Sequence, residues 1–467
     1  MPQGFVPGGT QDDSVLLAGG RVVTPDGVLD PGWILVTGGL IGAIGPGDAR
    51  DQMARGLPAV GLHGQDQVMR GLVEVDLRER WVLPGFIDLH VHGGGGALFT
   101  EGTEADAIQA AAFHRAHGST SLLASLVTAP LAELEARAAL LAGLADEGVI
   151  AGLHLEGPFL SAARCGAQDP RHMLAPDVAV FERLHAAARG HLRVITLAPE
   201  LPGAAEVIRA AVRSGVTVAV GHTDATAEVA SAAVDTGATH ATHLFNGMRP
   251  WHHREPGAAG ALLDRDEVTC EIVADGVHLH DMTVRLAARA AGPGRLVLIT
   301  DAMAAAGMPD GRYRLGSRRV DVAGGVARLV GETGVPGAIA GSTATMANVV
   351  RHAVAAGVPV PEAAAAASTT PARVLRLGER TGALRPGLVA DLVVCDEEFG
   401  LDRVMRHGRW LPGPGAQDEQ ARLGAQDERA RLGGEDERPR LGAQDERARL
   451  GGEDERARFS PVRGPIP

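Results

Sequence analysis

Five short apolar segments of this chain each end in a side chain that can bind a metal or transfer a proton. They cover residues 86–92, 150–156, 216–222, 239–243 and 297–301, and they close on His, Glu or Asp. One polar residue at the end of an apolar strand is common, but five in order along one stretch of chain are not. We therefore interpret them as strand ends that build one site at one end of a barrel.

The first two segments carry side chains with the chemistry of metal ligands. His90 and His92 are two residues apart, so on a strand both imidazoles point to the same side and can hold one cation. Glu156 ends the second segment, where its carboxylate can bridge two cations. Each has an alternative, because a His-x-His pair alone is more often structural and Glu156 can be a solvated or helix-capping residue.

His222, His243 and Asp301 end the three remaining segments. With Glu156, the two histidines form a His₂-carboxylate set, which in catalytic metal sites leaves positions open for water. Asp301 can accept a proton from activated water and pass it on. Singly, either histidine is more often structural, and Asp301 can be a helix N-cap. His240 should point away from the site on a strand, so we interpret it as structural.

Strand-like and helix-like stretches alternate from residue 85 to about residue 376. Strand-like runs begin near Phe86, Thr120, Val149, Leu192, Val216, Thr239, Cys270 and Leu296. Helices are expected at 104–117, 130–147, 176–189, 203–214, 225–237, 281–291, 343–357 and 361–376. This alternation predicts an α/β fold with a (β/α)₈ TIM-like barrel. The connection at 247–268 is longer than usual, and a hairpin is expected between residues 313 and 330.

Both ends of the chain carry β-rich runs, at 15–46 and 383–411. We expect them to form one small β-sandwich domain, residues 14–83 with 380–412, and we expect the barrel domain to span residues 84–379. Residues 413–467 contain five nine-residue repeats, at 415–459, each with one large apolar residue. That is too few to bury a face, so we predict a disordered tail that is dispensable for catalysis.

The composition argues against several classes of function. The formal charge of the 467 residues is −13, so nothing supports binding to nucleic acid. Three separated cysteines form no disulfide framework, and we find no signal sequence or long apolar run, so we expect a cytoplasmic protein that does not bind membranes. The sequence contains no lysine, which excludes a Schiff base, a P-loop lysine and a carbamylated lysine.

Seven motifs contain or surround the candidate ligands. They are PGFIDLHVH at 84–92, HLEGPF at 154–159, GHTDA at 221–225, HLFNGM at 243–248, REPG at 254–257, ADGVH at 274–278 and TDAM at 300–303. Together they resemble the N-acetylglucosamine-6-phosphate deacetylase family of the amidohydrolase superfamily. The resemblance spans about residues 15–410 and leaves out the repeats.

The resemblance implies a metal-dependent hydrolase that converts N-acetylglucosamine 6-phosphate to glucosamine 6-phosphate and acetate. It implies that Glu156, His222 and His243 hold the main divalent metal, with zinc or iron favoured. His90 and His92 are both present, so one or two metals per subunit are expected, with Glu156 as the bridge. Asp301 would move the proton from water to the departing amine.

The resemblance also implies substrate contacts from Asn246, the backbone of Gly247, Arg254 and His278. Arg254 would reach across the interface of a homodimer to the neighbouring subunit's site. Gln168 stands where the family commonly has a histidine that hydrogen-bonds the acetyl oxygen, and its amide can donate a hydrogen bond but cannot become cationic. Two alternatives are another amidohydrolase, such as a deaminase or a cyclic-amide hydrolase, and a catalytically silent binding protein on the same barrel.

Overall fold

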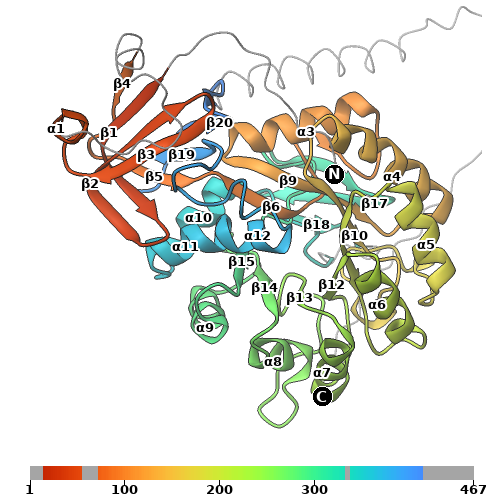
Figure 1. Cartoon of the computed structure of the whole chain (residues 1–467). Coiled ribbons are helices and arrows are strands. Elements are labelled where there is room, and N and C mark those ends of the chain that lie inside the picture. The colour runs from red at the N-terminus through yellow and green to blue at the C-terminus, as the bar shows by residue number, and fades with distance from the viewer. Residues whose placement is uncertain (1–13, 55–71, 332–336, 414–467) are drawn as a thin grey trace, which may run out of the picture. The chain divides into compact units, whose positions relative to one another are not determined.

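The structure is a computed structural model that describes residues 14–54, 72–331 and 337–413. The predicted disordered tail, residues 413–467 with the repeats at 415–459, lies outside these ranges apart from its first residue. The described chain starts in a mixed sheet, runs through a barrel of parallel strands surrounded by helices, and returns to the mixed sheet (Figure 1).

Eight parallel strands form the barrel, as predicted, and hydrogen bonds join them in the order β15-β14-β13-β12-β11-β10-β9-β6. Their residues are mostly buried, because helices cover the outer face of such a sheet. The strands are β6 (Phe86–Val91), β9 (Ser119–Val127), β10 (Gly152–Glu156), β11 (Leu192–Leu197), β12 (Thr217–Val220), β13 (His240–Ala241), β14 (Thr269–Ile272) and β15 (Leu296–Leu298).

The barrel is nearly closed, because the residues that follow β15 join it to β6. The Asp301 backbone N–H donates to the His90 carbonyl at 2.9 Å. One residue earlier, the Thr300 hydroxyl donates to the buried carboxylate of Asp88 on β6, at 2.6 Å. The closure of the barrel therefore also carries Asp301 to the strand that holds the His-x-His pair.

The predicted helices lie close to their expected positions, with two corrections, and the structure adds the short helix α1, which was not expected. They are α1 (Ala49–Ala54), α3 (Glu104–Ala116), α4 (Leu131–Asp146), α5 (Val178–Ala187), α6 (Ala204–Arg213), α7 (Ala227–Thr236), α8 (Gly257–Asp264), α9 (Asp281–Ala291), α10 (Met346–Ala355), α11 (Val360–Ala367) and α12 (Thr369–Val374), with 3₁₀ turns at Ala162–Arg164 and Pro170–His172.

The two corrections have local causes. Helix α8 lies within the stretch 247–268, which was expected to be a connection. It was not predicted, because the glycines of its sequence GAAGALLD give it low helix propensity. The single helix expected at 361–376 is two helices, α11 and α12, separated at Ser368, whose φ is −141°. Pro371 has no N–H to offer the carbonyl of Ala367, so one continuous helix cannot form there.

Strands from both chain ends lie side by side in one mixed sheet, as expected (Figure 1). The order is β21-β20-β19-β5-β1-β2-β3, with β4 paired to β1. Hydrogen bonds connect all these strands into one sheet. The expected division into two sandwich layers and the expected domain limits therefore stay predictions. The strands are β1 (Val15–Thr24), β2 (Gly27–Thr37), β3 (Leu40–Pro46), β4 (Val73–Asp76), β5 (Trp81–Pro84), β19 (Leu392–Cys395), β20 (Leu401–Arg406) and β21 (Arg409–Trp410).

A three-stranded antiparallel sheet occupies the region where a hairpin was expected. It contains β16 (Gly311–Leu315), β17 (Arg318–Ala323) and β18 (Val326–Leu329), and its apolar face packs on Val127 and Met303 near the ends of barrel strands. The Ser317 hydroxyl donates to Asp169 at 2.5 Å, which ties this sheet to the loop after β10. Two short strands, β7 (Gly93–Gly94) and β8 (Ala97–Leu98), follow the His-x-His pair.

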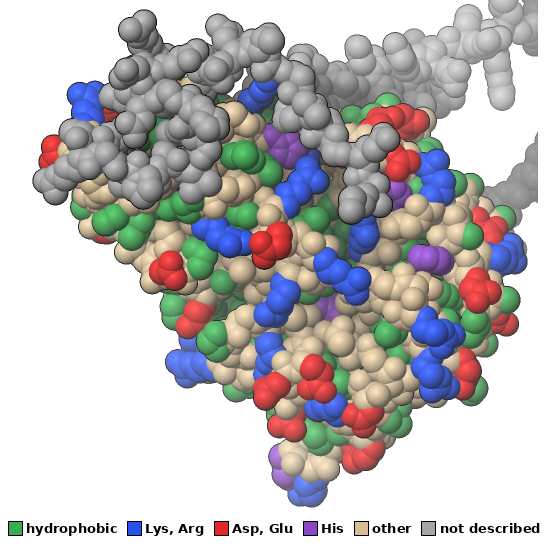
Figure 2. All heavy atoms as spheres, in the orientation of Figure 1, with side chains coloured by type: hydrophobic (Ala, Val, Ile, Leu, Met, Phe, Trp, Pro, Cys, Tyr) green, Lys and Arg blue, Asp and Glu red, His purple; other side chains and the backbone are tan. Residues whose placement is uncertain are grey.

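The surface has mixed charge on the face drawn in Figure 2. Arginine and acidic side chains are interspersed there instead of forming one continuous basic surface. Within the described part of the chain, every helix is too short or too polar to cross a membrane.

Candidate metal centre and active site

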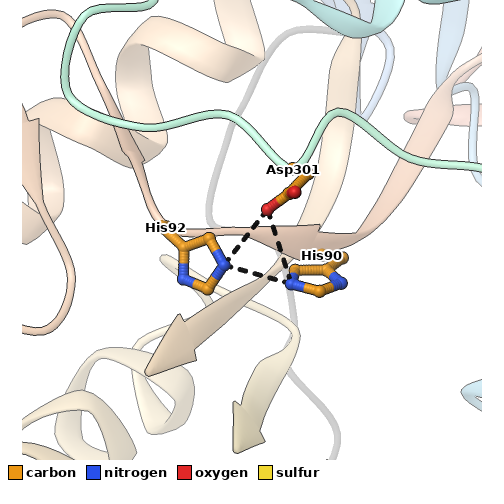
Figure 3. Close-up of side chains that lie close together, drawn as sticks. All are labelled: His90, His92 and Asp301. Carbon is orange, nitrogen blue, oxygen red and sulfur yellow. Dashed lines mark hydrogen bonds and ion pairs between the residues drawn. The ribbon is translucent and has the colours of Figure 1, made fainter. Parts of the chain in front are cut away.

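Six ionisable side chains from five strand ends converge at the carboxyl end of the barrel. They form two groups of three: His90, His92 and Asp301 (the His90 group), and Glu156, His222 and His243 (the Glu156 group). Within each group the candidate ligand atoms lie within 4.8 Å of one another, and no residue of either group is more than 8% exposed in the described structure. Figure 3 shows His90 on β6, His92 directly after this strand and Asp301 on the loop above, all pointing toward one another. The structure thus brings the six predicted residues together, and their roles stay predictions.

Three of these residues have an unusual backbone conformation at the point where their strands end. His222, His243 and Asp301 have φ values of +47°, +26° and +50°, a region that residues other than glycine rarely adopt. Holding such a residue there costs on the order of 1–3 kcal/mol. Hydrogen bonds fix the turns, for example from the Ser161 N–H to the His222 carbonyl at 2.9 Å. Strained residues of this kind cluster at functional sites.

Glu156 lies between the two groups. One carboxylate oxygen, Oε1, is 2.9 Å from Nε2 of His222 and 2.9 Å from Nε2 of His243. The other, Oε2, is 3.2 Å from Nε2 of His92. The carboxylate therefore faces both groups, as a bridging ligand would.

The four histidines all turn Nε2 toward the centre and Nδ1 toward an acceptor. The Nδ1 acceptors are the carbonyls of Ser125 (for His92, 3.3 Å), Arg164 (for His222, 2.8 Å) and Asn246 (for His243, 3.1 Å), and the carboxylate of Glu271 (for His90, 3.2 Å). An Nδ1–H bonded in this way leaves a lone pair on Nε2, which is the form that binds a metal.

The surrounding histidines favour the ionised form of both carboxylates, and the carboxylates in turn favour positive charge in the site. Burial works against ionisation of Glu156, but His90 and His222 hold its pKa well below its usual range. Burial also raises the pKa of Asp301, yet the hydrogen bond from His92 and the charges of His90 and His92 lower it to about 2. Conversely, burial lowers the pKa of His92, while Asp301 and Glu156 raise it to about 9. A bound cation would meet the same demand for positive charge.

The donor set fits divalent cations. Imidazole nitrogens with carboxylate oxygens suit zinc, iron, manganese or cobalt. The Nε2 atoms of His90 and His92 are 3.1 Å apart, and those of His222 and His243 are 3.2 Å apart. Two nitrogen lone pairs at these distances repel each other, so each pair is favourable only with a proton or a cation beside it.

Gln168, predicted to contact the substrate, lies against Glu156. Its amide nitrogen donates to Glu156 Oε2 at 2.5 Å, and its amide oxygen accepts from the Thr128 N–H at 2.8 Å. One N–H of the amide is therefore used, and only the second could reach an acetyl oxygen. Gln168 is 5% exposed, and its amide holds the Glu156 carboxylate and the Thr128 N–H together.

Asn246 and Gly247 adjoin the Glu156 group. The Asn246 carbonyl is the acceptor for His243 Nδ1, and the Asn246 amide donates back to the His243 carbonyl at 3.3 Å. A Cβ at Gly247, where φ is +60°, would come within 2.9 Å of His222 Nδ1. Only glycine keeps this turn against the His222 ring without a shift.

The two remaining predicted substrate residues differ in position. His278 is held by Asp275 at 2.8 Å and lies close enough to Asp301 to respond to its charge. Arg254 instead lies on an exposed loop, where its guanidinium contacts His253 at 2.7 Å. Within one subunit, the contacts described for Arg254 are thus to its neighbours in the loop and not to either ligand group.

The sequence analysis did not identify Glu271. It lies on β14, is 1% exposed, and contacts His90 Nδ1 at 3.2 Å and His240 Nε2 at 2.9 Å. His240, interpreted as structural, is fully buried and reaches the site through Glu271. The available signal was an acid within the apolar run CEIV at 270–273, because a buried carboxylate needs partners.

A parallel barrel with a His-x-His pair, two further histidines and two buried acids at its carboxyl end has the features of the metal-dependent amidohydrolases. The amidohydrolase family model matches residues 81–411. A mutant of N-acetyl-D-glucosamine-6-phosphate deacetylase from Mycobacterium smegmatis, solved in complex with N-acetyl-D-glucosamine-6-phosphate, is 43% identical, with a TM-score of 0.77 over 85% of this chain and 99% of that chain. This chain belongs to the N-acetylglucosamine-6-phosphate deacetylase family.

Two curated relatives are each 36% identical to this chain. The N-acetylglucosamine-6-phosphate deacetylase of Lysinibacillus sphaericus is 36% identical, in an alignment that covers 73% of this chain and 88% of the relative. The N-acetylgalactosamine-6-phosphate deacetylase of Escherichia coli O157:H7 is also 36% identical, over 84% of this chain and 97% of the relative.

Proposed function

We propose that this chain hydrolyses the acetamide bond of N-acetylglucosamine 6-phosphate and releases acetate and glucosamine 6-phosphate. The observation that carries the proposal is the convergence of four Nε2 atoms and two buried carboxylates in a member of this deacetylase family. An isolated ligand group could be structural, but two adjoining groups with an ionised acid in each can bind metal and accept a proton.

The Glu156 group would hold the main divalent metal and the His90 group a second one, with Glu156 facing both. Zinc or iron is the proposed metal. When bound, divalent cations supply Lewis acidity, which lowers the pKa of water and polarises an amide carbonyl. The chain's contribution is to fix each Nε2 through the Nδ1 contacts and to keep the ligands buried.

Asp301 is the proposed proton carrier. Its low pKa keeps it ionised at neutral pH, so it can accept a proton from the attacking water. The Asp301 N–H is bonded to His90, and its carbonyl accepts from the Ser342 N–H at 2.7 Å, so the backbone on both sides of the carboxylate is fixed. The same carboxyl would then release the proton to the departing amine nitrogen.

The sugar phosphate would be bound by cationic and amide groups at the rim of the site. Burial lowers the pKa of His278, but Asp275 raises it overall, which favours a cationic imidazole suited to phosphate. Asn246 and the backbone of Gly247 adjoin the Glu156 group, and the second N–H of Gln168 would meet the acetyl oxygen.

Arg254 is proposed to serve the neighbouring subunit of a homodimer. It is exposed on its loop and contacts His253 there, and the nearby indole of Trp251 is 49% exposed. A large exposed aromatic beside an arginine is typical of a subunit interface. Sedimentation analysis of wild type and Trp251→Ala tests this, and a monomeric wild type with full activity contradicts it.

The central experiment measures acetate release from N-acetylglucosamine 6-phosphate, before and after treatment with a chelator. We expect turnover to disappear with the chelator and to return with added zinc or ferrous iron. N-acetylglucosamine without phosphate is the control substrate and should react far more slowly, because it lacks the group that His278 and Arg254 would bind. Equal rates on both sugars favour another amidohydrolase, and metal binding without turnover favours a silent binding protein.

The 4-epimer, N-acetylgalactosamine 6-phosphate, is a second candidate substrate. The relative from Escherichia coli O157:H7 that carries this name is as identical to the chain as the deacetylase from Lysinibacillus sphaericus, over a longer alignment. A comparison of kcat/KM for the two epimers decides between them. The cytoplasmic location expected from the sequence is also a proposal, which fractionation of the producing cells would test.

A further inference from the structure

We propose that Glu271 and His240, here called the Glu271–His240 pair, are positioning residues. They hold His90 in the orientation and tautomer in which the His90 group binds a divalent cation. The inference rests on the metal-dependent function proposed above and adds residues that none of the motifs contains. Both side chains are buried, at 1% and 0% exposed, and neither belongs to the two ligand groups.

His90 differs from the other three ligand histidines in what holds its Nδ1. His92, His222 and His243 donate to backbone carbonyls, whereas His90 donates to a carboxylate oxygen of Glu271 at 3.2 Å. In Figure 3 the second ring nitrogen of His90 indeed points away from His92 and Asp301. A carboxylate acceptor makes the imidazole a stronger metal donor than a neutral carbonyl does.

The carboxylate of Glu271 is itself fully engaged. Its Oε2 accepts from His90 Nδ1 and from the His243 backbone N–H, both at 3.2 Å, and its Oε1 accepts from His240 Nε2 at 2.9 Å. His240 is in turn fixed by the hydroxyl of Thr269, 2.5 Å from its Nδ1. The pair therefore spans the barrel interior from β13 and β14 to β6.

Two physical consequences follow for His90. The Glu271 contact fixes its tautomer, with the proton on Nδ1 and the lone pair on Nε2, which faces His92 at 3.1 Å. The charge of Glu271 also offsets part of the positive charge of two neighbouring cations, which repel each other. Glu271 lies between the imidazoles of His90 and His240, and these two contacts favour its ionised form.

A purely structural role would look different in solution. A carboxylate that only fills the core would, when replaced, weaken the fold and both ligand groups alike. A positioning residue should instead affect the His90 group, which it contacts through a side chain, more than the Glu156 group, which it contacts only through the His243 backbone.

The test is a Co²⁺ titration of the full-length chain, stripped of metal with a chelator, followed by the visible absorption of bound Co²⁺. We expect wild type to bind two equivalents in two steps. His92→Ala removes a ligand of the His90 group, so the step that it abolishes is assigned to that group. Glu271→Gln keeps the shape and an acceptor oxygen but removes the charge, and it should weaken that step by about tenfold, whereas Glu271→Leu should weaken it by about 100-fold.

The matched control is Asp391→Asn, which neutralises a buried carboxylate far along the chain that accepts from Thr381 at 3.0 Å and from the His407 N–H at 2.8 Å. It should leave both steps unchanged. His240→Leu should weaken the His90-group step on its own but add nothing in a Glu271→Leu background, because it acts through Glu271. If Glu271→Leu fails to fold, Glu271→Gln and the single variant His240→Leu still decide the test, because neither contains that substitution.

The proposal is overturned if Glu271→Gln leaves the assigned step unchanged, if both steps weaken equally, or if wild type binds only one equivalent. Deacetylation is measured separately on the loaded wild-type chain. If wild type binds two equivalents but releases no acetate, the proposed function fails, while the Co²⁺ titration still decides the role of the Glu271–His240 pair.

Discussion

The two ligand groups at the carboxyl end of the barrel are held in different ways. In the Glu156 group, His222 and His243 lie just beyond their strands in left-handed backbone, and their Nδ1 atoms bond to loop carbonyls. In the His90 group, both histidines sit at the end of β6, with Nδ1 partners on β9 and β14. The histidines of the Glu156 group are therefore held by loops, and those of the His90 group are held by the barrel strands.

This difference suggests a division of labour within one site. A group held by loops can adjust when a substrate enters, whereas a group fixed to the barrel wall stays in place. Glu156 belongs to both, because its carboxylate contacts His222, His243 and His92. Turnover should therefore fall most when the shared residue Glu156 is replaced. It should fall less when a residue of one group is replaced, and least when a residue that only supports a group is replaced.

The largest effect is expected for Glu156→Gln, which removes the charge that the groups share. We expect kcat to fall by roughly 10³-fold or more, because metal assistance supplies several kcal/mol to such a transition state. Metal content per chain, measured by mass spectrometry, should fall in parallel. The control is Glu135→Gln on α4, where the carboxylate pairs with Arg183 at 2.7 Å away from both groups. Full metal content in Glu156→Gln would contradict the shared role.

Asp301→Asn should act on the His90 group alone. A positioned proton carrier contributes about 10²–10⁴-fold, so we expect kcat for acetate release to drop by that factor. The Glu156 group should keep its metal, since the ligand atoms of His222 and His243 contact Glu156 and not Asp301. Undiminished turnover would remove Asp301 from its proposed role, and loss of all metal would show that the two groups are not separable.

The barrel strands and the convergence of the six candidate ligands could be predicted from the sequence, because each candidate lies at the end of a local apolar run. Glu156 and Asp301 could be placed at strand ends without knowing what lies across the barrel. Helix α8 was not predicted, because two glycines in eight residues obscure a helix whose stability comes from burial against its neighbours.

The supports of the ligands could not be derived in the same way. The acceptors of His92 and His222 are backbone carbonyls, which carry no signature of residue type. Glu271 meets His90 only because the near closure of the barrel brings β6 beside the residues after β15, two strands from β14, and such a contact depends on tertiary structure. The bond from Gln168 to Glu156 is of the same kind, since the loop after β10 returns to the strand end.

Gln168→Ala tests how far the Glu156 group depends on the hydrogen bond from Gln168 to Glu156. A hydrogen bond to a charged group is worth about 1.5–3 kcal/mol, so we expect kcat/KM to fall by roughly 10- to 100-fold. The cause is looser positioning of Glu156, together with an unpaired Thr128 N–H. Gln168→His keeps a donor at this position and should lose less. If kcat/KM falls as far in Gln168→His as in Gln168→Ala, the hydrogen bond donated to Glu156 does not explain the loss.

Thr300→Val tests the claim that the barrel wall holds the His90 group, and its effect on turnover should be the smallest. Thr300 precedes Asp301, and its hydroxyl donates a hydrogen bond to the buried carboxylate of Asp88 at 2.6 Å. The change removes this hydrogen bond, so the free energy of unfolding should fall by about 1–3 kcal/mol. Because the Asp301 N–H still donates to the His90 carbonyl, kcat should change by less than about threefold, well under 1 kcal/mol. Thr300→Ser keeps the hydroxyl and should be nearly as stable as wild type in urea unfolding. A large loss of kcat in Thr300→Val, with stability unchanged, would instead mean that the hydroxyl takes part in the reaction.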